Sequence, residues 1–302
     1  MSAPRREKRD VSGWIVLDKP LGMTSTEAVG KLRWLFGAKK AGHAGTLDPL
    51  ATGILPIAFG EATKAVPVVQ DGTKLYRFSI VWGAATATDD REGEVIATSD
   101  VRPDTTALEA VLPSFIGAIA QVPPQFSALK IDGERAYDLA RAGESVLLAP
   151  RIVDIDSLKI VSHSATETVL DAACGKGTYV RSLARDIAEA LGTRGHVGQL
   201  ERCAVGAFTL ARAISVAELE ALDRDGRDSK LLPVAAGLAD WPELRLSPHE
   251  AQTLRFGNPV LLTGAGAPLA MDFAWASCKG MAVALGSVEF GQFKPSRVFA
   301  GG

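Results

Sequence analysis

The sequence is poor in cysteine and contains no long hydrophobic run. Its three cysteines, Cys174, Cys203 and Cys278, lie far apart and form no CxxC pair. Neither a disulfide framework nor a zinc site is therefore expected, and a reducing cytoplasm is the expected compartment. No stretch approaches the ~18 apolar residues of a membrane helix. The N-terminus, MSAPRREKRD, is charged and has no apolar signal core behind it, so we expect neither a membrane segment nor export.

Motifs for nucleotide, flavin and metal binding are also missing. There is no Walker loop and no GxGxxG fingerprint, and GKGT at 175–178 is too short to count as either. His43 has no His, Cys or acidic partner at metal-ligand spacing, and the other histidines are isolated. The sequence therefore predicts no metal and no cofactor.

What is present is an ordinary globular composition with an uneven distribution of charge. The 302 residues are 47% hydrophobic and 23% charged, which suits one large domain or a large domain and a small one. The net charge of −2 argues against a general nucleic-acid binder. Residues 1–80, however, carry 12 Lys and Arg against 7 Asp and Glu, a net charge of +5 that leaves −7 for the rest. This distribution permits a local basic face, but scattered solvated charge explains it equally well.

Hydrophobic periodicity predicts strands and helices that are mixed without a regular βαβ rhythm. The spacing predicts strands over 14–20, 75–83 and the two segments RIVDIDSLKIV and ETVLDAACGKGTYV, with a hairpin turn at 89–95. Helices are expected after the capping-box pair Thr24 and Glu27, over 105–117 and 137–142, and from Ser182 onward, with Gly192 after the helix. The predicted fold class is α+β with a largely antiparallel sheet.

Domain boundaries are predicted from composition. The polar stretch LDRDGRDSK within 220–240 is a candidate linker, and the glycine-separated apolar runs after it predict a small β-rich module over 242–302. The predicted large domain covers residues 1–235. Within it, residues 121–151 combine Pro and Gly with four cations, which is typical of an RNA-contacting insertion but also of an ordinary surface connection.

One acidic residue stands out in the loop GHAGTLDPLATG, residues 42–53. Asp48 is flanked by Leu47, Pro49 and Leu50, so it is expected to be poorly solvated and to need a cation or amide donors to stay charged. The simpler interpretation is an Asp that caps a turn. On the residues alone, a turn-capping aspartate is commoner than a functional one.

Aromatic and cationic residues suggest a second candidate site. If GTYVR is extended, Tyr179 and Arg181 point to the same side, where a ring can stack on a base and a guanidinium can hold a carboxylate or phosphate. A Tyr–Arg pair on the surface is the simpler explanation. Tyr76 shares an apolar strand face with Phe78, Ile80 and Trp82, so the pattern favours a core aromatic, although its place near the strand start would let it line a pocket.

Four blocks of sequence resemble the bacterial tRNA pseudouridine-55 synthase family. They are VLDKPLGMTS, KKAGHAGTLDPLATGILPIAFGEATK, QVPPQFSALKIDGERAYDLARAG and GTYVRSLARDIAEALGT, and the match covers roughly residues 13–210 in the family's order. Many family members end in a PUA domain, a small RNA-binding β-barrel, and the ending PSRVF at 295–299 is similar. The resemblance implies a pseudouridine-synthase fold followed by a PUA-like domain.

The resemblance also implies a reaction and a nucleophile. A uridine at position 55, in the T loop of tRNA, would be isomerised to pseudouridine without a cofactor, and the family's catalytic aspartate falls on Asp48. Tyr76 would stack on the flipped base, Arg181 would form an ion pair with the nucleophile, and Tyr179 would be the adjacent pocket wall. Leu200 would make an apolar contact to the uridine.

Further residues are assigned by the same resemblance. His43 would pack against displaced RNA bases, and Lys64 is a reasonable phosphate contact. Lys19 and Pro20 would border the site in a mainly structural role.

Three hypotheses follow from these observations. The favoured one is a cytoplasmic, monomeric isomerase that acts on the T arm of tRNA, with which a tRNA-folding role could coexist. The second is the same chemistry on ribosomal or small nuclear RNA. The third is a non-enzymatic RNA-binding or folding module, against which an intact set of Asp48, Tyr76, Tyr179 and Arg181 argues.

Overall fold

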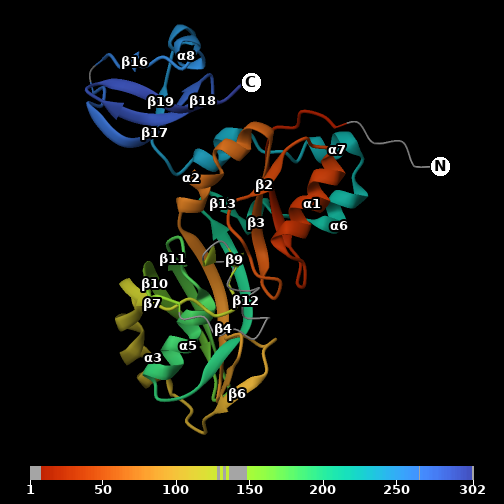
Figure 1. The fold of residues 1–302 in the computed structure, drawn as a ribbon, viewed down its shortest axis with the longest axis vertical. Helices are drawn as coiled ribbons and strands as arrows, with labels where there is room; N and C mark the ends of the chain where they lie inside the picture. Colours follow the sequence, from red (N-terminus) through yellow and green to blue (C-terminus); the bar gives the residue numbers. More distant parts are fainter. Residues whose placement is uncertain (1–7, 128–129, 132–133, 136–147, 265, 301–302) are drawn as a thin grey trace, which may run out of the picture. The chain divides into compact units, whose positions relative to one another are not determined.

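The computed structural model describes residues 8–127, 130–131, 134–135, 148–264 and 266–300 (Figure 1). The chain divides into two units. The first unit holds the chain up to Pro49, Gly53–Gly72 and the chain from Ala204 onward; the second holds Leu50–Thr52 and Thr73–Cys203. Helices and sheets are mixed in both, so the predicted α+β class is confirmed. The helix predicted at 137–142 lies outside the described residues.

In the first unit, neighbouring strands follow the order β14 (Ile214–Ser215), β1 (Gly13–Lys19) and β3 (Thr52–Phe59), with β2 (Ala41–His43) beside β3. Strand β1 runs antiparallel to β3 along its whole length and parallel to β14. The short elements of this unit are η1 (Gly60–Lys64), α2 (Val66–Asp71), β13 (Phe208–Thr209) and η3 (Leu210–Arg212).

Helix α1 (Ser25–Phe36) forms where the sequence predicts it. The Thr24 hydroxyl accepts a hydrogen bond from the Glu27 amide, and the Glu27 carboxylate accepts one from the Thr24 amide, which completes the capping box. Gly37 ends the helix at φ 61, a left-handed conformation that glycine adopts without steric cost.

The linker predicted within 220–240 is wrong. This stretch forms α6 (Val216–Ala221), α7 (Arg224–Asp228) and η4 (Val234–Leu238). Arg227 Nη1 donates to Leu35 O at 3.3 Å, and Trp14 Nε1 donates to Val234 O at 3.1 Å. Asp223 caps α7 by accepting from the Gly226 amide at 2.8 Å, so the charges that suggested a solvated linker instead begin a helix and fix it to α1.

The last sixty residues form the predicted β-rich module. Its sheet has the order β15 (Glu243–Arg245), β17 (Ala270–Cys278), β18 (Met281–Glu289), β19 (Gln292–Val298) and β16 (Val260–Leu261). Helix α8 (Pro248–Arg255) packs against this sheet (Figure 1), and its capping box of Ser247 and Glu250 is a sequence signal that our prediction overlooked.

The β-rich module has one hydrophobic cluster of its own and shares another. Leu254, Val260 and Phe293 belong to its own cluster. Trp275 and Leu285 instead pack in the cluster that contains Trp14 of β1. The module therefore contributes to the core of the first unit.

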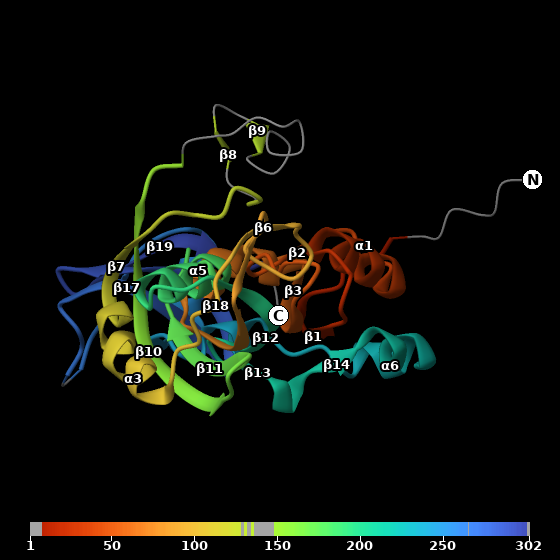
Figure 2. The ribbon, with the colours of Figure 1, turned by 90° about the horizontal axis from the view of Figure 1, so that it is seen from below.

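In the second unit, neighbouring strands follow the order β12 (Gly195–Val205), β4 (Lys74–Trp82), β11 (Glu167–Cys174), β10 (Arg151–His163) and β7 (Gly117–Gln121). The described pairings of β4 with β11, β11 with β10 and β10 with β7 are antiparallel, as predicted. Helix α5 (Val180–Ala190) lies against this sheet (Figures 1 and 2), and its Leu183 and Ile187 are buried.

Shorter elements complete the second unit. The predicted hairpin turn joins β5 (Ala84–Thr86) to β6 (Val95–Thr98), and a second hairpin consists of β8 (Lys130–Ile131) and β9 (Glu134–Arg135). The helix predicted over 105–117 is shorter. It comprises α3 (Thr105–Val111) and then η2 (Leu112–Phe115), because Pro113 has no amide to continue the helical hydrogen bonds.

Candidate active site

The loop that carries Asp48 is held on both sides of this residue by the segment around the start of α1. Ser25 is 3% exposed, donates from Oγ to Leu47 O at 2.9 Å and accepts from the Leu47 amide at 2.8 Å. The Gly22 amide donates to Pro49 O at 2.7 Å. Asp48 is half-buried between these two fixed neighbours, so its backbone position is well defined.

Lys19 strengthens the same attachment. Its side chain is fully buried, and Nζ lies 3.0 Å from Pro20 O, 2.8 Å from Met23 O and 3.4 Å from Pro49 O. A buried ammonium needs such acceptors to offset the cost of its desolvation. The structural role that the resemblance assigns to Lys19 and Pro20 stays a prediction.

Two other predicted site residues lie in the first unit. His43 is half-buried on β2, opposite Ile57 of β3. Lys64 Nζ donates to Glu61 Oε2 at 2.7 Å and to Val298 O at 2.8 Å. The ammonium of Lys64 thus links η1 to the last strand, and its contact to phosphate stays a prediction.

Tyr76 and Leu200 lie on strands of the second unit. Tyr76 pairs with Ala172 across β4 and β11 and is half-buried, whereas Phe78 and Trp82 on the same face of the strand are buried. The pattern that favoured a core aromatic therefore holds for those two residues but not fully for Tyr76. Leu200, on β12, is 7% exposed.

The interpretation of GTYVR as extended is wrong, because α5 begins at Val180 and includes Arg181. Tyr179 is the residue before the helix, and its amide donates to Gln121 Oε1 at 2.8 Å. The acceptor thus comes from β7, 58 residues earlier in the chain. A search for a local Ser, Thr, Asp or Asn cap led us to place the start at Ser182, two residues too late.

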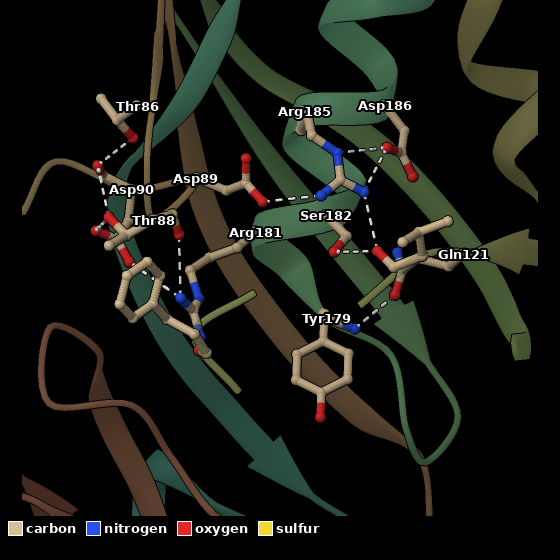
Figure 3. A network of polar contacts seen from close by, with 12 residues as sticks. Thr86, Thr88, Asp89, Asp90, Gln121, Tyr179, Arg181, Ser182, Arg185 and Asp186 are labelled. Atoms are coloured by element: carbon tan, nitrogen blue, oxygen red, sulfur yellow. Dashed lines mark hydrogen bonds and ion pairs between the residues drawn. The ribbon is translucent and has the colours of Figure 1, made fainter. Parts of the chain in front are cut away.

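The guanidinium of Arg181 is held by oxygen atoms from two segments (Figure 3). Arg181 is 5% exposed, and Nη1 donates to Thr88 O at 3.1 Å and to Asp90 Oδ2 at 3.4 Å. Nη2 donates to Phe126 O at 2.9 Å. The buried cation is thereby placed in a defined position at the first turn of α5.

Asp90 is a residue that the sequence analysis missed. It is 2% exposed, and its two carboxylate oxygens have different partners. Oδ1 accepts from Thr88 Oγ1 at 2.5 Å and from the Glu92 amide at 3.0 Å, while Oδ2 faces Arg181. The sequence signal was the pair of acids in DDREG, which we interpreted only as a turn.

Metal ligands do not gather in the part of the chain that the structure describes. No group of three or more His, Cys, Asp or Glu side chains there could hold a metal ion. Among the same residues, no helix has both the length and the apolar character needed to cross a bilayer.

Comparison with known families gives two matches. Residues 33–180 match the model of the TruB family pseudouridylate synthase N-terminal domain, and residues 181–239 match that of the tRNA pseudouridylate synthase B C-terminal domain. The tRNA pseudouridine synthase B of Brucella ovis is 51% identical over 99% of this chain and 98% of its own length. The enzyme of the same name from Sinorhizobium medicae is 49% identical, with both chains fully covered.

Solved structures resemble the fold. A chain from the crystal structure of a Cbf5–Nop10–Gar1 complex has a TM-score of 0.74 and 23% identity, covering 95% of this chain and 84% of that chain. A chain from the archaeal box H/ACA sRNP Nop10–Cbf5 complex has a TM-score of 0.73 and 21% identity, covering 95% and 86%. At this level of identity the likeness concerns the fold alone.

Proposed function

The chain belongs to the TruB family of pseudouridylate synthases and isomerises a uridine of tRNA to pseudouridine, and we propose that Asp48 is the nucleophile and that uridine 55 of the T loop is the target. The N1–C1′ bond breaks, the uracil turns, and C5 joins C1′, so that C5 loses a proton and N1 gains one. Attack at C1′, attack at uracil C6 and elimination to a glycal all need a carboxylate at the sugar or base.

The observation that carries this proposal is the attachment of Leu47 and Pro49 on either side of Asp48. A nucleophile reacts fastest when it is already held in the reactive geometry, because little orientational freedom remains to be lost on the way to the transition state. Hydrogen bonds to the backbone of its two neighbours hold Asp48 in place.

Residues of the second unit bind the uridine in this proposal. The half-buried ring of Tyr76 stacks on the flipped base, Leu200 makes an apolar contact, and the buried cation of Arg181 supplies positive charge, with Tyr179 beside it. Flipping costs a few kcal/mol but exposes C1′ and C5 to attack. In the first unit, His43 packs against displaced bases and Lys64 contacts a phosphate.

The Asp48→Asn variant tests the nucleophile. We expect no turnover of unmodified tRNA, measured as release of tritium from uridine C5, and a nearly unchanged Kd for tRNA, because phosphate contacts elsewhere supply most of the affinity. The control is Asp100→Asn, which alters an exposed aspartate and should retain full activity. Substantial isomerisation by Asp48→Asn would refute the assignment.

The target position is tested with substrates. A tRNA that carries cytidine at position 55 should yield no pseudouridine, whereas a minimal T-arm hairpin should yield it. Ribosomal RNA fragments modified at a comparable rate would favour broader specificity. The proposed monomer and cytoplasmic location are tested by light scattering and by fractionation of cells.

The domain assignment is also a proposal. Residues 1–235 form the catalytic domain, and the five-stranded sheet within 242–302 is a PUA-like RNA-binding domain. Residues 121–151, of which the structure describes 121–127, 130–131, 134–135 and 148–151, are an RNA-contacting insertion. Hydrogen exchange should show added protection of 121–151 when tRNA binds, because its cations approach phosphates; unchanged exchange there would contradict this role.

A further inference from the structure

Helix α5 carries two arginines that are one helical turn apart and bind the same two segments (Figure 3). These segments are the turn 86–91 and residues 121–127. We call the contacts of Arg181 to Thr88, Asp90 and Phe126 the inner clamp. The contacts of Arg185 form a second set, the outer clamp, and they repeat this arrangement one turn further along the helix.

The outer clamp joins three segments through one guanidinium. Arg185 Nη1 donates to Asp89 Oδ2 at 2.8 Å, and Nη2 donates to Val122 O at 2.9 Å. Nε donates to Asp186 Oδ1 at 2.9 Å. Ser182 Oγ also donates to Val122 O, at 2.8 Å. The side chains of Arg185 and Asp89 are only 22% and 15% exposed, so solvent weakens this ion pair less than it would an exposed pair.

Asp89 has an unusual backbone that needs such support. Its φ is 59, in the left-handed region, which is sterically disfavoured for residues other than glycine, although Asp adopts it more often than most. Conformations of this kind persist only where the surroundings fix them. Because Asp89 directly precedes Asp90, its conformation sets the direction in which Asp90 presents Oδ2 to Arg181.

The charges around Asp89 explain why a cation is required. Burial raises the pKa of Asp89 and of Asp186, and Arg185 opposes both shifts. Arg181 lowers the pKa of Asp89 as well, whereas Asp186 raises it. Without Arg185, two half-buried carboxylates would repel each other, and the turn 86–91 would relax away from α5.

We propose that Arg185 is a positioning residue of the isomerase, which fixes the turn 86–91 and the segment 121–127 so that the inner clamp holds Arg181 in its reactive position. The proposal rests on the proposed role of Arg181 at the reacting uridine. Arg185 acts through Asp89 and Val122 and does not touch the substrate.

The test is single-turnover pseudouridine formation by the full chain at saturating tRNA, well below the melting temperature of each variant. Arg185→Gln should lower the rate about 10- to 100-fold, since a misplacement of about 1 Å has effects of this size, and should change the Kd for tRNA less than about twofold. Arg185→Lys should recover part of the rate, because it keeps the charge but not the forked geometry. The matched control is Arg194→Gln, which alters an exposed arginine paired with Glu189, and it should match the wild type.

Non-additivity separates positioning from general stability. The Arg181→Lys variant should already be slow. Adding Arg185→Gln to it should slow the reaction little further, because both changes disturb the placement of the same cation at the first turn of α5. A wild-type rate for Arg185→Gln, or its full effect retained in the Arg181→Lys background, would overturn the proposal. A wild-type rate for Arg181→Lys would instead refute the proposed function of Arg181, so the two failures are distinguishable.

Discussion

The Asp48 loop and the first turn of α5 are held in different ways. The described anchors of the Asp48 loop are hydrogen bonds to the backbone of Leu47 and Pro49, and their side-chain donors lie 22 to 30 residues away in sequence. Arg181 is anchored through its own guanidinium, by partners 55 to 93 residues away. The described contacts at the acid fix its neighbours in the chain, whereas those at the arginine fix its own charged group.

This difference sets the expected size of mutational effects. A buried group that loses a neutral hydrogen-bond partner costs about 1–3 kcal/mol. Removing one member of a buried ion pair costs about 3–5 kcal/mol, because it leaves the other charge uncompensated. Substitutions in the inner clamp should therefore destabilise the protein more than substitutions in the contacts that hold the Asp48 loop.

The largest effect is expected for Asp90→Asn. One carboxylate oxygen of Asp90 holds its own turn and the other faces Arg181, and an amide has only one oxygen for these two tasks. We expect the free energy of unfolding to fall by about 3 kcal/mol and kcat to fall about 100-fold. Urea unfolding and steady-state kinetics measure the two effects.

The control for Asp90→Asn is Glu92→Gln, which changes an exposed side chain in the same turn and should be nearly neutral. A wild-type kcat for Asp90→Asn would show that the charge opposite Arg181 is dispensable. The contrast between the two anchors would then be lost.

A smaller effect is expected for Ser25→Ala. The variant leaves the amide and the carbonyl of Leu47 without their buried partner, so the free energy of unfolding should fall by about 1–3 kcal/mol. We expect kcat to fall about tenfold, equivalent to about 1.4 kcal/mol in the barrier, with little change in KM. Thermal denaturation and initial-rate measurements test this.

Ser25→Thr, which keeps the hydroxyl, should recover part of the lost rate, and Thr26→Ala, at the exposed neighbouring position, should have no effect. If Ser25→Ala slows the enzyme as much as Asp90→Asn, anchoring through neighbours is as critical as anchoring through charge.

The same contrast explains what could be predicted from the sequence. Contacts between residues close in sequence leave local signals, such as the capping box of α1, the glycines of the Asp48 loop and the alternation of β4. The start of α5 was misplaced because the residue before it, Tyr179, donates its amide to Gln121, from a distant strand, and no local side chain caps the helix. Asp90 was missed because only tertiary structure reveals that a turn aspartate faces a buried arginine. The role of 220–240 was wrong because solvated and helix-capping charges look alike in composition.

The β-rich module carries cations that hold neither the Asp48 loop nor Arg181. Arg255 ends α8, and Lys279 lies in the turn between β17 and β18; both are exposed and form no ion pair among the residues that the structure describes. Arg245 and Lys294 are paired with Glu243 and Glu289. Deleting 242–302 would also uncover the cluster around Trp14, so point variants test RNA binding more cleanly than truncation.

The smallest effect is expected for the double variant Arg255→Ala/Lys279→Ala. Since neither residue belongs to an anchor, kcat at saturating tRNA should not change, while KM should rise about two- to fourfold as phosphate contacts are lost. The slope of log KM against log salt should fall by about 1 for each lost contact, because fewer counterions are released on binding. The matched double variant Arg245→Ala/Lys294→Ala should change KM less, because these cations are already neutralised by carboxylates. A fall in kcat with unchanged KM would mean that the module acts on the chemical step, and the division between anchors and binding surface would be wrong.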